Sequence, residues 1–268
     1  MLGFAEGLLP WVAITLLPAF VGLLLVVSVE KVMNQKYLSA FALGIFLWFF
    51  VDTIKASGEL DVAAGLAGGA SQVALVGLFV IGVLLFFSTD RHQKVFSPRE
   101  AVGKYGVTIP LLVAVSVGIH GIGEGASFGG TAALTSSASL LDAFGGISSG
   151  LAYVLHKVLE PMMIGACYCV YSSQRAKNTA DLLKDLAVLS TVFAIPSLVG
   201  GVSGYYLTYD SSYFYALGTG TSVYAAMRLA GPLFSTVQSV SQKETIKIAL
   251  SLALGLLAIY FAALFHSG

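Results

Sequence analysis

WVAITLLPAFVGLLLVVSV, residues Trp11–Val29, is one of several apolar runs that decide the fold of this chain. A helix needs about 20 apolar residues to cross a hydrocarbon core about 30 Å thick. Inside lipid every backbone N–H and C=O must be paired within the segment, so such a run is expected to be helical. The alternating ten-residue pattern of a membrane β-barrel is not seen in the sequence. The run therefore predicts a transmembrane helix.

The composition of the whole chain agrees with this interpretation. Of its 268 residues 57% are hydrophobic and only 10% are charged, whereas soluble domains carry about 25% charged residues. The formal net charge is zero, so nothing indicates a nucleic-acid partner. We predict an all-α, multi-pass protein of the cell membrane whose main non-protein contact is the lipid bilayer.

About eight spans can be placed along the sequence. No connection between them is long enough for a soluble domain, so residues 1–268 are predicted to form a single transmembrane domain. The predicted spans are Trp11–Val29, Leu38–Ile54, Gln72–Ser88, Tyr105–Thr131, Leu141–Tyr171, Leu186–Leu207, Tyr213–Phe234 and Ile246–Phe265.

The basic residues predict the orientation, because Lys and Arg accumulate in cytoplasmic loops. The even-numbered connections hold only Lys55, and both termini are therefore predicted to lie outside the cytoplasm. The odd-numbered connections hold Lys31, Lys36, Arg91, Lys94, Arg99, Lys104, Arg175, Lys177, Lys184, Lys243 and Lys247.

Two matching motifs lie inside the fourth and fifth spans. His120-Gly-Ile-Gly-Glu124 and His156-Lys-Val-Leu-Glu160 both place a His one helical turn from a Glu. Both His residues fall about 22 Å into their spans at 1.5 Å per residue. Ionisable side chains at this depth are costly and usually face a partner or a water-filled cavity. We expect all four side chains to converge near the membrane midplane.

Imidazole nitrogens and carboxylate oxygens around one point suit Zn²⁺, and also Fe²⁺, Mn²⁺ or Cd²⁺. Binding requires neutral His and ionised Glu, so the affinity should fall as the pH drops. The surrounding backbone is irregular. Gly121, Gly123 and Gly125 weaken the helix around the first motif, and Pro161 removes a backbone donor beside the second. Broken helices near the midplane are typical of transporter binding sites.

With these motifs and this topology the chain resembles the ZIP family of divalent-metal transporters. The resemblance implies metal coordination by His120, Glu124, His156 and Glu160, and transport of the metal toward the cytoplasm. It also implies a pseudo-twofold arrangement of the first three and last three helices around the fourth and fifth. The metal is then cargo, and no resident cofactor is expected.

The chain departs from the family where Lys157 follows the fifth-span His, at a position that often carries an acidic or amide residue. A fixed cation there would disfavour a second ion, so we predict one metal per site. The first motif also has Gly121 and Gly123 where the family often has Asn and Pro.

Four further residues carry expectations. Asp52, at the outer end of the second span, guides cations into the pathway or pairs with Lys55. Arg228 forms a structural ion pair with Glu124 or Asp52, or reaches the outer interface. Cys167 and Cys169 are two residues apart and point to different sides of a helix, so they are not expected to form a disulfide.

We predict that the protein is not an enzyme. Two alternative functions remain open. The same His/Glu cluster would suit a membrane-embedded zinc hydrolase, although the chain lacks a His-Glu-x-x-His helix. The other alternative is a metal sensor that binds the ion but does not transport it. A homodimer is also left open.

Overall fold

A computed structural model describes residues 4–57, 69–90, 106–134, 146–172, 176, 178–207, 209–236 and 241–264. This part of the chain is entirely helical, which confirms the predicted fold class. Its nine helices are α1 (Phe4–Glu30), α2 (Gln35–Ser57), α3 (Gly69–Thr89), α4 (Thr108–Gly118), α5 (Gly121–Leu134), α7 (Ile147–Tyr171), α8 (Thr179–Tyr206), α9 (Ser212–Thr236) and α10 (Gln242–Ala263).

Five of these helices are long and apolar enough to cross a membrane: α1, α2, α3, α8 and α10. The number rises to six when α4 and α5 are counted as one bent span. Helices α7 and α9 are 25 residues long, but their compositions are more polar because they carry the buried charged residues Lys157, Glu160 and Arg228. The full count of eight spans stays a prediction.

The predicted fourth span is broken at its first motif. Helix α4 ends at Gly118, Ile119 and His120 form a turn, and α5 begins at Gly121 with its axis bent by 41°. Closely spaced glycines weaken a helix because they gain little from fixing the backbone. The expected irregularity is therefore present, and it places His120 at the break.

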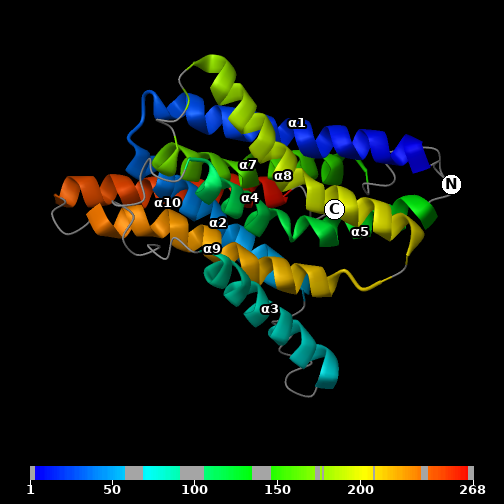
Figure 1. Ribbon diagram of the computed structural model, residues 1–268. Helices are drawn as coiled ribbons and strands as arrows, with labels where there is room; N and C mark the ends of the chain where they lie inside the picture. The colour runs from blue at the N-terminus through cyan, green and yellow to red at the C-terminus, as the bar shows by residue number, and fades with distance from the viewer. Residues whose placement is uncertain are drawn as a thin grey trace.

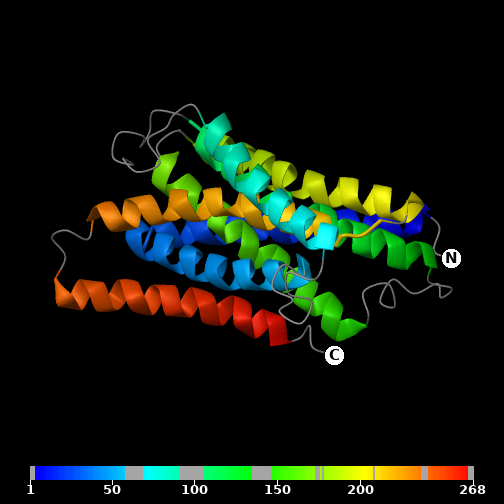
Figure 2. The ribbon, with the colours of Figure 1, turned by 90° about the horizontal axis from the view of Figure 1, so that it is seen from below.

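The helices form two groups that can be followed in Figures 1 and 2. Group A consists of α1, α4, α5, α7 and α8, which pack mainly on one another, with α5 against α8 and α1 against α7. Group B consists of α2, α3, α9 and α10, with α10 against α2 and α3 against α9. The pseudo-twofold arrangement implied by the resemblance stays a prediction.

Glycines allow close backbone contact inside each group. A β-carbon on Gly204 of α8 would collide with the carbonyl oxygen of Ala126 on α5. A β-carbon on Gly220 of α9 would collide with the carbonyl oxygen of Phe79 on α3. Small residues at such contacts let membrane helices approach closely and gain dispersion energy. Each group is therefore tightly packed within itself.

The two ends of the bundle differ in their basic residues. We call the end at which α2, α5 and α8 finish the outer end, and the end at which α1 and α7 finish the inner end. Among the described residues, the inner end has Lys31, Lys36, Lys184, Lys243 and Lys247, and the outer end has Lys55 in the last turn of α2. Lys36 pairs with Glu244 of α10. Several of the basic residues from which the orientation was predicted lie outside the described residues: Arg91, Lys94, Arg99, Lys104, Arg175 and Lys177.

The expected partners of Arg228 were wrong. Its fully buried guanidinium forms an ion pair with Asp90, at the inner end of α3, and its Nε donates to the Tyr224 hydroxyl at 3.0 Å. The Tyr224 hydroxyl in turn donates to Asp90 at 2.7 Å. Arg228 lies in the inner half of α9, so Asp52 and the outer interface are at the wrong depth. Asp90 follows the predicted third span and lies at the matching depth.

Cys167 and Cys169 are both fully buried in the inner half of α7, and both are free thiols. The expectation that they do not pair with each other is confirmed. Free Cys commonly serves as a small buried apolar residue.

Because a buried charge without its partner is strongly unfavourable, Arg228→Met alone should destabilise the protein by about 3–5 kcal/mol. The double variant Asp90→Asn/Arg228→Met should recover most of this loss. Thermal unfolding in detergent, followed by size-exclusion chromatography, measures both. The control is Lys247→Met, on the exposed second turn of α10. Equal stability of Arg228→Met and wild type would contradict the role of the pair.

Candidate metal site

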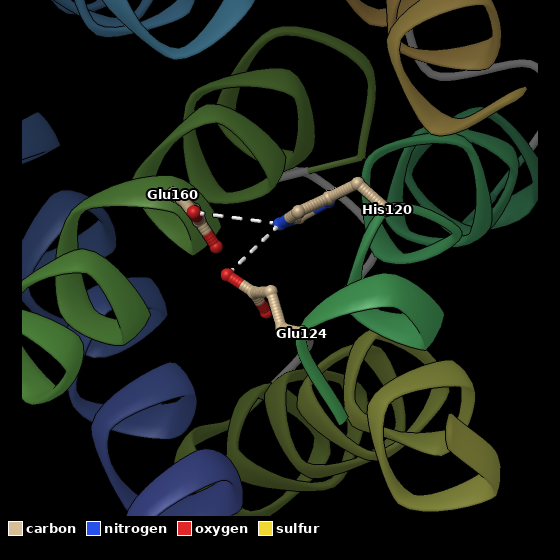
Figure 3. Close-up of side chains that lie close together, drawn as sticks. All are labelled: His120, Glu124 and Glu160. Atoms are coloured by element: carbon tan, nitrogen blue, oxygen red, sulfur yellow. Dashed lines mark ion pairs between the residues drawn. The ribbon is translucent and has the colours of Figure 1, made fainter. Parts of the chain in front are cut away.

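Three of the four predicted ligands meet at the break between α4 and α5. His120 lies in the break, Glu124 in the first turn of α5, and Glu160 in the middle of α7. Their side chains point toward one another (Figure 3). One possible ligand atom from each lies within 4.8 Å of the others, so the three could hold a metal ion.

Two contacts to the imidazole ring, one hydrogen bond and one aromatic contact, fix the orientation of His120. Its Nδ1 lies within hydrogen-bonding distance of the carbonyl oxygen of Val117, which can only accept. Nδ1 therefore carries the proton, and in the neutral ring Nε2 presents its lone pair to the two carboxylates. Phe49 of α2 packs edge-on against the imidazole, with ring centroids 4.7 Å apart. A hydrogen bond on the far ring nitrogen is the usual way to orient a metal-binding His.

The result is three acceptor atoms that face one another. His120 Nε2 lies 3.4 Å from Glu160 Oε1 and 3.6 Å from Glu124 Oε1. It is buried and makes no hydrogen bond to any described residue. Acceptors at this separation repel one another unless a cation lies between them. The arrangement therefore needs either a bound cation or a proton on His120.

The separations fit a metal ion well. Zinc bonds of about 2.0–2.1 Å in a tetrahedral arrangement place neighbouring ligand atoms about 3.3–3.4 Å apart. The two observed distances are close to this spacing. A His with two carboxylates also suits transition metals better than Mg²⁺ or Ca²⁺, which prefer oxygen ligands alone.

Lys157 lies against the site, as the sequence predicted from its position on α7. Its Nζ is 2.6 Å from Glu124 Oε2 and 2.8 Å from Glu160 Oε2, and the side chain is fully buried. The ammonium also lies over the ring of Phe193, 5.2 Å from its centroid. Lys157 thus binds the second oxygen of each carboxylate and leaves each Oε1 facing His120. With His120 neutral, the local charge is −1.

His156 is not part of the three-residue cluster within the described residues. It lies one turn before Glu160 on α7, toward the outer end, and lines the cavity that reaches the site. Glu124 is contacted by the ammonium of Lys157, the next residue on α7.

A cavity of about 530 Å³ connects the cluster to the outer end. His120, Glu124 and Glu160 lie at its base, and Asp52 lines it with Lys55 near the end of α2. Asp52 is exposed, as expected for a residue that attracts cations into the pathway. Hydroxyl groups follow the wall between the two levels, from Ser127, Thr131, Ser149 and Tyr153.

On the inner side of the cluster the surroundings are apolar. Val117 lies one turn before His120, Ile164 one turn after Glu160, and Phe193 packs against Gly118; all three are buried. The site is therefore reached from one side of the bundle in this conformation.

Two contacts of the site had no clear signal in the sequence. Phe49 and Gly218 come from group B and approach His120 from α2 and α9. A β-carbon on Gly218 would collide with the backbone and Cβ of His120.

A search against protein-family models finds no match, and neither does a search of curated proteins.

Gly218→Ala should displace the turn that carries His120, because the added methyl group has no room. Disturbing the support of a metal ligand typically lowers the affinity about 10- to 100-fold. Zinc titration of the purified protein measures this. Gly77→Ala is the control, since a β-carbon on Gly77 meets nothing within 4 Å. Equal zinc affinity in both variants would contradict the contact.

Proposed function

We propose that this protein transports a divalent transition metal, with zinc the best-fitting ion, across the membrane toward the cytoplasm. The observation that carries the proposal is the set of three converging acceptor atoms on His120, Glu124 and Glu160. They lie at the base of a cavity, on helices with the length and composition of membrane spans or next to such helices. The resemblance of the two motifs to the ZIP family supports the same function.

In this proposal an ion enters from the outer end past Asp52 and exchanges its water for protein ligands at the cluster. The carboxylates replace the lost hydration, and the imidazole selects against Mg²⁺ and Ca²⁺. His156, which lines the cavity, is the proposed fourth ligand. The helices must then rearrange to expose the cluster to the inner side. The proposed topology has eight spans, with both termini outside the cytoplasm.

A zinc hydrolase is the alternative, because three protein ligands and a water-filled fourth position are typical of catalytic zinc. Such an enzyme also needs a general base beside the metal-bound water. Here the second oxygen of each Glu is bound to the Lys157 ammonium, so neither carboxylate is free for that role. This contact favours transport over hydrolysis.

Uptake of radiolabelled zinc into proteoliposomes tests the proposal. Wild type should show saturable uptake, and His120→Ala and Glu160→Gln should each lose nearly all of it. His120→Ala removes one ligand, and Glu160→Gln replaces a charged ligand with a weaker neutral one. Glu6→Gln, on the exposed first turn of α1, should transport like wild type. Absence of wild-type flux for zinc, iron, manganese and cadmium would refute transport. Turnover of a lipid or peptide without flux would establish the hydrolase.

Lys157 should limit the site to one ion. Equilibrium dialysis of the purified protein should give one zinc per chain, because the ammonium neutralises the oxygens that a second ion would need. Lys157→Gln frees both Oε2 atoms and should raise the ratio to two. Lys184→Gln, on the exposed surface of α8, should leave it at one. Two ions bound to wild type would show that the ammonium does not fill the second position.

A further inference from the structure

Two buried hydrogen bonds join group A to group B on the inner side of the metal site. Thr221 Oγ1 of α9 donates to the carbonyl oxygen of Ser116 on α4 at 2.7 Å. Tyr171 of α7 donates through its hydroxyl to the carbonyl oxygen of Arg228 on α9 at 2.9 Å. In both, a side chain of one group binds the main chain of the other.

A third bond has the same form at the inner end. Gln35 Nε2, at the start of α2, donates to the carbonyl oxygen of Cys169 on α7 at 2.9 Å. The same amide nitrogen lies 2.8 Å from Glu30 Oε1, at the end of α1. Gln35, from group B, is thus bonded to two helices of group A.

The three bonds lie at two depths on the inner side of the metal site. Ser116 lies one turn before His120, so the bond from Thr221 is directly beneath the cluster. Tyr171 and Gln35 act at the inner end of the bundle. On the outer side the cavity lies between the groups, because α2 of group B lines it together with α1, α5 and α7 of group A.

Close backbone contacts are more numerous within each group than between the groups, where Gly218 of α9 meets the backbone of His120. A β-carbon on Gly22 of α1 would collide with the carbonyl oxygen of Val158 on α7, and one on Gly44 of α2 with that of Leu252 on α10. Backbones in such close contact resist separation because they interlock. A side-chain hydrogen bond to a carbonyl can break and be replaced by water without distorting either helix. Movement between the groups is therefore easier than movement within them.

We infer that the hydrogen bonds of Thr221, Tyr171 and Gln35 form a latch that holds the inner side closed in this conformation. The latch opens when the site becomes accessible from the inner side. This inference rests on the proposed function, which requires access from both sides. The net contribution of one hydrogen bond corresponds to about a fivefold change in an equilibrium. Loss of two bonds should thus favour the inward-open form about 25-fold.

The native cysteines report on the inner side. Cys167 and Cys169 are fully buried in α7, so a thiol reagent reaches them only when this side opens. Wild type, Tyr171→Phe, Thr221→Val and the double variant would be labelled in lipid nanodiscs, and each cysteine followed by peptide mass spectrometry. Tyr260→Phe and Thr191→Val are matched controls, because both residues are exposed.

The substitution Ser127→Cys, in the lining of the outer cavity, reports on the outer side. The latch predicts faster labelling of Cys167 and Cys169, about fivefold in each single variant and about 25-fold in the double variant. Labelling of the Ser127→Cys site should be slower in the same variants. Labelling rates equal to those of wild type, or a rise on both sides as in general unfolding, would overturn the latch.

Zinc flux through the same variants separates this inference from the proposed function. Reciprocal labelling in a protein without flux would leave the latch intact and refute transport. Flux in wild type with labelling unchanged in the variants would support transport and refute the latch.

Discussion

Three hydrogen-bond acceptor atoms lie close together in the interior of this helical bundle, and the surrounding structure must offset their mutual repulsion. His120 Nε2 and the Oε1 atoms of Glu124 and Glu160 lie close enough to repel, and a cation between them or a proton on His120 relieves that repulsion. The break between α4 and α5 exists at this point and turns His120 toward α7. Gly218 allows α9 to support the turn from behind. The irregular backbone is thus explained by the site that it carries.

The charge balance of the site follows from the same requirement. Two carboxylates buried without compensation would be very unfavourable, and the Lys157 ammonium relieves part of this cost by binding the oxygens that face away from His120. One negative charge remains for an incoming ion. The cavity brings water and cations to the cluster from the outer end, while Val117 and Phe193 separate it from the inner end. A site with one open side and one closed side is what the proposed transport requires of one of its two states.

Much of this could be predicted from the sequence because helical periodicity is rigid. The i,i+4 spacing of His120 and Glu124 fixed their common face, and the spacing of Lys157 and Glu160 predicted the contact that the structure contains. The rotation of α7 about its own axis is set by packing and has no such signal. Three of the four predicted ligands lie in the cluster, and coordination by His156 stays a prediction. Arg228 was assigned the wrong partner because the pairing of α3 with α9 depends on tertiary contacts. Its depth within the span would have indicated Asp90.

X-ray absorption at the zinc K-edge on the zinc-loaded protein tests the central claim most directly, because it reports the ligand atoms themselves. The account predicts a first shell of nitrogen and oxygen only, at about 2.0–2.2 Å, with the outer-shell scattering of coordinated imidazole. His120→Ala should weaken or remove the imidazole signal. Sulfur at about 2.3 Å would place the ion at Cys167 or Cys169 instead. Either that result, or the absence of stoichiometric zinc, would contradict the account.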